Sequence, residues 1–163
     1  MKNQGPNKIR TQVGGTHYIR FPYEPIDFIM DIEADFCVGN IIKYISRYLY
    51  KNGVEDLKKA LQYASFIIER GIVYRLNARA IEYLARYVTV NNLSLKQTQI
   101  LRSLIKGYIC VTSSYIEILI EEEYGKRKRS NRNVRNGKGS ACLEPTETYQ
   151  LCSGEDAVPT DLR

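Results

Sequence analysis

Apolar residues recur every three or four positions through most of the first 124 residues, which is the spacing of one face of an α-helix. No segment alternates apolar and polar residues as a half-buried strand does. The last helical stretch is one long helix or two, since Gly107 or the β-branched run 109–112 weakens it. We therefore expect an all-α fold, with helices over residues 25–34, 38–53, 54–71, 72–90 and 95–124.

A short turn joins the second and third predicted helices. Asn52-Gly53 are residue types that end helices, and Glu55 and Asp56 suit the positive N-terminal end of the helix that follows. A connection this short brings the two helices together as a central antiparallel hairpin. The residues expected to face the core are Ile26, Ile29, Met30 and Ile32 in the first helix, Ile41, Ile45, Tyr48 and Leu49 in the second, and Leu57, Leu61, Ala64, Ile67 and Ile68 in the third.

Composition divides the 163 residues into three parts. Residues 1–24 form an N-terminal arm, and residues 25–124 form one helical domain, with a hairpin core at 25–70 and extra helices at 71–124. Residues 125–163 are rich in Gly, Ser, Asn, Pro and charge without a helical period, so we expect a disordered tail.

The net charge of +6 is unevenly placed along the chain. The segment 126–138, "KRKRSNRNVRNGK", carries seven Lys or Arg and no acid, whereas 139–163 carries five acids and a single basic residue, Arg163. Such a basic segment either binds polyanions weakly and without sequence preference or only keeps the protein soluble.

The sequence gives little support for a zinc site, a disulfide framework or a membrane-spanning segment. The four cysteines are too scattered for paired zinc-ligand spacing, and only one histidine accompanies them. We expect Cys37 and Cys110 to be small buried apolar residues and a disulfide framework to be absent. No apolar run is long enough to cross a bilayer and no secretory signal precedes the arm, so we expect a soluble cytoplasmic protein without a membrane partner.

One face of the second predicted helix is polar. Asn40, Lys43 and Arg47 fall at i, i+3 and i+7, which stacks an amide, an ammonium and a guanidinium in one line that suits an anion. Aromatic planes for a base lie near it in the sequence, at Tyr44, Tyr48, Tyr50 and Tyr63. The alternative is an ordinary solvated face with tyrosines at the edge of the core.

The only histidine, His17, lies in "VGGTHYIRF" at residues 13–21, directly after a Gly-Gly pair and a threonine. This segment is either a loop that closes over an anionic ligand or an arm that packs on the helices. In the second case the imidazole would simply bond a backbone carbonyl.

The run "GGTHY…PYEPIDFI…FCVGNIIKYISRYLYKNGVEDLKKALQYASFIIE" strongly resembles a family of small phage proteins. The characterised member of that family is a phage nucleotide kinase, which acts on deoxynucleoside monophosphates and lacks the usual phosphate-binding loop. The resemblance covers about residues 13–70 and rests on "HY" before "PIDFI", on "GN-x-x-K-Y-x-x-R-Y", and on "K-N-G-x-E-D-L-K-K-A-x-x-Y". Residues 71–163 have no part in it.

The resemblance implies a protein that transfers a phosphoryl group from a triphosphate donor to a deoxynucleoside monophosphate, in the cytoplasm of a bacterial host. We hypothesise that Lys43 and Arg47 hold phosphates while His17 closes over them, and that Glu55 and Asp56 hold magnesium. The remaining motif positions implied to contact nucleotide are Tyr18, Asn40, Tyr44, Lys51 and Lys59. Because donor and acceptor are both anionic, we also expect a homo-oligomer, with Tyr83, Tyr87, Tyr108 and Tyr115 available for self-association.

Three other functions remain open. A nucleotide-binding protein without catalysis, for instance one that sequesters a nucleotide signal of host defence, would use the same cationic face. An all-α nucleotide pyrophosphohydrolase is a weaker alternative, since the acidic patches 24–27, 31–35 and 121–123 lack the paired E-x-x-E and E-x-x-D arrangement of such enzymes. A nucleic-acid-binding accessory would use the basic segment 126–138.

Overall fold

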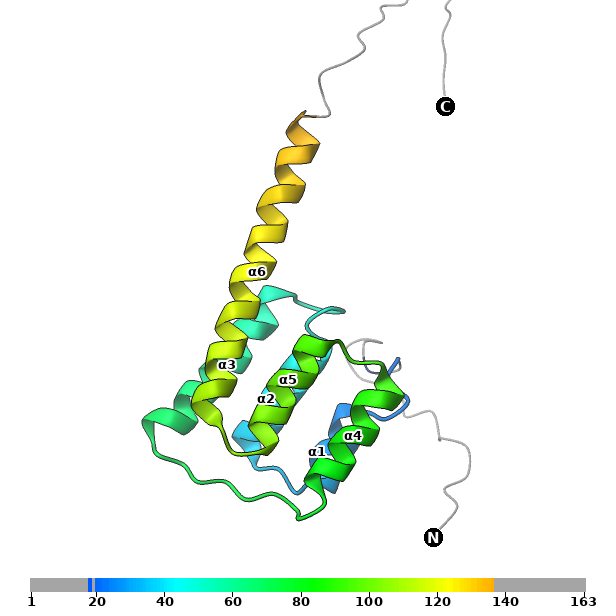
Figure 1. The fold of residues 1–163 in the computed structure, drawn as a ribbon, viewed down its shortest axis with the longest axis vertical. Helices are drawn as coiled ribbons and strands as arrows, with labels where there is room; N and C mark the ends of the chain where they lie inside the picture. The colour runs from blue at the N-terminus through cyan, green and yellow to red at the C-terminus, as the bar shows by residue number, and fades with distance from the viewer. Residues whose placement is uncertain (1–17, 19, 137–163) are drawn as a thin grey trace, which may run out of the picture.

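The computed structural model describes residue 18 and residues 20–136. These residues form an all-α bundle without strands, as the hydrophobic period predicts (Figure 1). The helices are α1 (Pro25–Asp31), α2 (Phe36–Arg47), α3 (Val54–Glu69), α4 (Ala80–Asn91), α5 (Leu95–Ile105) and α6 (Ile109–Asn136).

The α2–α3 hairpin is the centre of the bundle. Helix α2 packs against α1, α3 and α5, while α6 covers α3 and also packs on α5. The turn between α2 and α3 contains Gly53 with a φ of 56° and a ψ of −128°, a conformation that side chains disfavour and glycine tolerates. The apolar residues Ile41, Ile45 and Leu57 are fully buried where these helices meet.

Local chemistry confirms the predicted helix start at residue 95 and decides between one helix and two in the stretch that follows. The Ser94 side chain accepts from the backbone N–H of Gln97, whose own side chain reaches back to the Ser94 backbone N–H, a capping box that starts α5. The interruption after α5 lies at Gly107, where φ is 81°, so the last helical stretch is two helices rather than one.

The predicted helix over 72–90 is wrong in its first part, since α4 begins only at Ala80. The chain from Ile72 runs extended along the bundle, where the Tyr74 hydroxyl donates to the Leu104 carbonyl at 2.6 Å. The Asn77 side chain accepts from the Arg79 backbone N–H at 2.9 Å and forms a local turn. These bonds replace the first helical turns.

The predicted tail boundary is also wrong, because α6 continues through Gly125 to Asn136 (Figure 1). Its first half packs on α3 and α5, and extending an existing helix adds one hydrogen bond for each residue ordered. The end of this 28-residue helix projects beyond the other helices. The predicted tail at 137–163 lies outside the described residues.

Several residues expected in the core are exposed. In α1 and just after it, Phe28 and Ile32 are buried, whereas Ile26 and Met30 are exposed, because the helix turns its other face toward α2 and α4. Cys37 is half-buried and Cys110 is exposed, so neither is the buried apolar residue we expected. Leu49 lies in the turn beyond α2, and Ile68 lies in the last turn of α3; both are exposed.

Among the helices of the described part, none is both long and apolar enough to span a bilayer.

Candidate functional site

The open side of the α2–α3 hairpin gathers most of the predicted site residues. The two helices run antiparallel, so successive turns of α2 face successive turns of α3 in reverse order. We call this the hairpin surface and define it by Asn40, Lys43, Tyr44 and Arg47 of α2 and Asp56, Lys59 and Tyr63 of α3.

At the turn end of the hairpin surface, Arg47 and Asp56 form a buried ion pair. Arg47 is 9% exposed and Asp56 is 0% exposed. The Arg47 Nε donates to Asp56 Oδ2 at 3.0 Å and its Nη2 donates to Asp56 Oδ1 at 3.2 Å. Asn52 Nδ2 donates to the same Oδ1 at 3.1 Å. Both oxygens of the Asp56 carboxylate are therefore occupied by protein donors.

The remaining Arg47 nitrogen, Nη1, donates to the Tyr18 hydroxyl at 3.0 Å. Burial opposes the charge of Arg47, but its hydrogen bonds with Asp56 and Tyr18 outweigh that effect and raise its pKa. Arg47 therefore stays charged and is held in one orientation. Tyr18 therefore lies against the hairpin surface.

Three cations surround the ring of Tyr44. Lys43 Nζ lies 4.3 Å from the ring centroid, Arg47 Cζ lies 4.9 Å from it, and Lys59 Nζ lies 5.8 Å from it. Each is within the range in which a cation is attracted to an aromatic face. The ring therefore helps to hold three like charges close together, and the carboxylate of Asp56 offsets one of them.

Lys43 is the cation of this group whose pKa is lowered. Burial lowers the pKa of Lys43, and the charges of Arg47 and Lys59 lower it further, against the opposite effect of Asp56. Its ammonium donates to Asn40 Oδ1, and Asn40 Nδ2 donates to the Phe36 carbonyl at 2.7 Å. An anion beside Lys43 would relieve this repulsion.

The four tyrosines proposed as aromatic planes separate into two groups. Tyr44 and Tyr63 stack at 6.1 Å between centroids, with 23° between their planes. Tyr48 instead belongs to the core, where burial raises its pKa to about 12. Tyr50 packs beneath Arg20, whose Cζ lies 4.1 Å from its ring centroid. Only the first pair lies on the hairpin surface.

Glu55 and Asp56 do not fit a magnesium site. Asp56 is fully buried and its oxygens accept from Arg47 and Asn52, whereas Glu55 is exposed and pairs with Lys58 at 3.0 Å. Within residues 18 and 20–136 no three acidic, histidine or cysteine side chains gather as metal ligands. We assign no step to a metal held by these acids.

The structure brings Tyr18, Asn40, Lys43, Tyr44, Arg47, Asp56 and Lys59 together. Lys51 is exposed in the turn, and His17 lies outside the described residues. Sequence reasoning missed the pairing of Arg47 with Asp56. The signal was a cation in the last turn of one helix and an acid in the first turn of the next, across a short connection.

Comparison with known proteins gives one match. Residues 13–65 match the model of a protein family described as a protein of unknown function, DUF3310. The match includes α1, α2 and most of α3, and its description names no activity. No curated protein and no solved structure matches the chain.

Proposed function

We propose that this protein binds the phosphates of a deoxynucleoside monophosphate at the hairpin surface and transfers a phosphoryl group to it from a triphosphate donor. The observation that carries the proposal is the gathering of Lys43, Arg47 and Lys59 within 5.8 Å of the Tyr44 ring centroid. The choice of reaction follows the resemblance of residues 13–70 to a family of small phage proteins whose characterised member is a nucleotide kinase.

Lys43 and Lys59 are the proposed phosphate ligands. Three positive side chains and the single negative charge of Asp56 leave a local charge of two positive units. Arg47 is held by Asp56 and Tyr18, so its role is to add fixed charge and to position the neighbouring Lys43. Fixed cations at the site of developing negative charge are the main source of catalysis in phosphoryl transfer.

The proposed reaction needs no general base. A phosphate oxygen of the acceptor attacks the γ-phosphorus of the donor, and the bond from that phosphorus to the β–γ bridging oxygen breaks. The acceptor oxygen is already ionised near neutral pH because the second pKa of a phosphate monoester is about 6. We extend the proposal to His17, whose neighbour in the sequence, Tyr18, contacts Arg47; His17 would then bind a phosphate.

We also propose that the protein is a homo-oligomer acting in the cytoplasm of a bacterial host. A single open helical surface contacts two anionic substrates from one side only. Of the tyrosines suggested for self-association, Tyr87 is fully buried and is excluded, whereas Tyr108 is exposed. Light scattering after size exclusion measures the number of subunits.

The test compares single variants of the full chain by calorimetry with deoxythymidine monophosphate and by a turnover assay with ATP. Lys43→Ala and Lys59→Ala should each weaken binding by about tenfold or more, as loss of a charge-assisted hydrogen bond does. Lys58→Ala is the matched control, because Lys58 precedes Lys59 but pairs with Glu55.

The outcomes separate the candidate functions. Tight binding without product would favour a protein that sequesters nucleotides. Release of pyrophosphate from a triphosphate would favour a pyrophosphohydrolase. Absence of nucleotide binding by the unaltered protein overturns the proposal.

A further inference from the structure

The hairpin surface continues beyond its cations as a group of aromatic rings. Phe36 meets Tyr63 edge-on at 5.7 Å between centroids, and Tyr63 meets Phe66 edge-on at 6.0 Å. Tyr63 is also the ring that stacks with Tyr44. We call Phe36, Tyr63 and Phe66 the aromatic cluster; it is joined to the cations through Tyr44.

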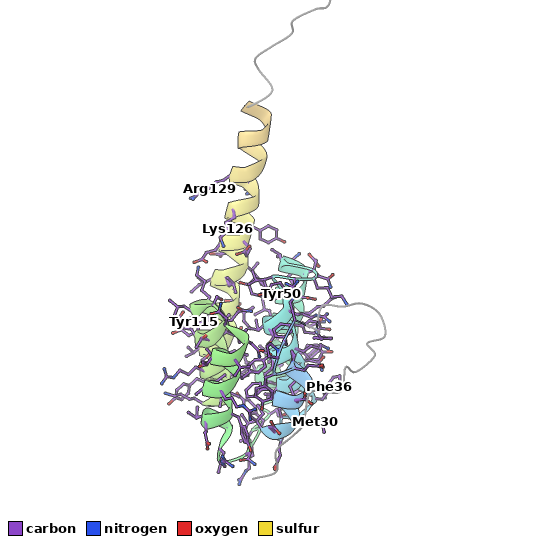
Figure 2. All side chains as sticks on the ribbon, turned by 90° about the vertical axis from the view of Figure 1, so that its right-hand side faces the viewer. Met30, Phe36, Tyr50, Tyr115, Lys126 and Arg129 are labelled. Atoms are coloured by element: carbon purple, nitrogen blue, oxygen red, sulfur yellow. The ribbon has the colours of Figure 1, made fainter. Side chains whose placement is uncertain are left out.

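The aromatic cluster exposes apolar area that the fold does not bury. Phe36 is 74% exposed and Phe66 is 39% exposed. Figure 2 shows Phe36 at the outer side of α2, away from α6. The face of α2 that packs into the core is formed by Val38, Ile41 and Ile45, which are fully buried, and Phe36 is not part of it. Phe36 is held by its contact with Tyr63 rather than by burial.

The aromatic cluster lies on the same faces of the two helices as the lysines, further from the turn that joins the helices. Phe36 lies seven residues before Lys43 on the same face of α2, which is about 10 Å along the helix axis. On α3, Lys59, Tyr63 and Phe66 follow at intervals of four and three residues and therefore share a face. A phosphate at the lysines thus places its attached base over the aromatic cluster.

We propose that the aromatic cluster is the base-binding subsite, in which the base of the bound deoxynucleoside monophosphate stacks on the exposed ring of Phe36, beside Tyr63. This inference rests on the function proposed above. Ring stacking is tolerant of base identity, because every base has a π-face. The subsite therefore accepts purine and pyrimidine monophosphates alike, and the phosphate supplies the remaining affinity.

The experiment uses the full chain and two probes, deoxythymidine monophosphate and deoxyribose 5-phosphate, which lacks the base. Phe36→Ala should weaken binding of the nucleotide by about tenfold or more and leave binding of the sugar phosphate unchanged. Phe36→Trp should retain nucleotide binding. Lys43→Ala should weaken both probes, which separates the base subsite from the phosphate ligands.

Met30→Ala is the matched control, because Met30 is an exposed apolar residue of α1 outside the aromatic cluster (Figure 2). Equal loss of both probes in Phe36→Ala, or no loss of either, overturns the inference while leaving the proposed function intact if Lys43→Ala still weakens binding. A change of subunit number without a change of affinity assigns the cluster to a protein interface and overturns it as well. If the unaltered protein binds neither probe, both proposals fail.

Discussion

Arg47 combines a structural and a proposed functional role in one side chain. Its guanidinium donates two hydrogen bonds to Asp56 and one to Tyr18. Its Cζ also lies 4.9 Å from the ring centroid of Tyr44. The sequence pattern predicts only a phosphate ligand on the polar face of α2. The ion pair with the fully buried Asp56 adds a structural role.

We predict that Arg47→Ala lowers the free energy of unfolding by about 3–5 kcal/mol, because it leaves the carboxylate of Asp56 buried without its ion partner. Urea unfolding followed by circular dichroism measures the loss. Arg79→Ala is the control, since Arg79 pairs with Glu82 in an exposed ion pair whose loss should leave the free energy of unfolding nearly unchanged. Equal losses in the two variants would contradict the structural role of Arg47.

We predict a pH dependence of nucleotide binding that originates at Lys43. The pKa of Lys43 is lowered from 10.5, the ordinary value for lysine. Lys43 therefore loses its proton at a lower pH than an ordinary lysine does. Binding of an anion requires the charged form, so affinity falls as pH rises through this lowered pKa. Above about pH 8 the phosphate no longer titrates, and calorimetry there isolates the effect.

The Lys43→Ala variant is the test of this assignment. It should bind more weakly at neutral pH and should lack the early alkaline decline. An unchanged decline in the variant would assign the titration to another group.

Among the elements, α6 departs furthest from the sequence prediction. Composition marks residues from 125 onward as a tail, yet the helix that packs on α3 and α5 carries the chain to Asn136. Figure 2 shows Lys126 and Arg129 on the part of α6 that projects from the bundle. Residues 126–136 of the basic segment thus lie on a helix attached to the bundle.

We predict that this projecting end binds polyanions in a salt-dependent way. Replacing the exposed Lys128 and Arg129 by glutamine should make the slope of log affinity for duplex DNA against log salt shallower, by about 0.9 for each phosphate that the protein no longer neutralises. Fluorescence anisotropy over a salt series measures it. Arg102→Gln with Lys106→Gln removes the same charge from exposed positions in and beside α5. If both double variants change the slope equally, only net charge matters.

At the scale of the whole molecule, the helices outside the family match complete the core of the hairpin. The Tyr87 hydroxyl of α4 donates to Ser46 Oγ at 2.7 Å, and Gln97 Nε2 of α5 donates to the Ile45 carbonyl at 2.8 Å. Helix α6 covers the inner side of α3. Within residues 20–136, α5 and α6 pack on the other side of the hairpin and leave the hairpin surface uncovered by a further helix.

We predict that Ile116→Ala lowers the free energy of unfolding by about 2–5 kcal/mol, because Ile116 of α6 is fully buried and its truncation leaves a cavity. Ile118→Ala, two positions along and 53% exposed, should change it by less than about 0.5 kcal/mol. Thermal and urea unfolding measure both. Similar effects in the two variants would show that α6 is not packed as described.

The sequence alone determined the helical class, the hairpin, the start of a helix at residue 95 and the alignment of Asn40, Lys43 and Arg47. These features depend on interactions between residues a few positions apart, namely the helical period, caps and turns, so the chain encodes them locally. The candidate site was predictable to the same extent, as a row of residue types on one face.

Only the tertiary structure decided the environment of each of these residues. Whether Arg47 meets solvent or Asp56, whether the chain at 72–79 is helical, and whether Phe36 is covered all depend on which segments pack together. Burial and ion pairing are energies of interaction between distant parts of the chain. A local pattern predicts which side chains share a face, but the packing of α3, α5 and α6 determines which of them remain accessible to a ligand.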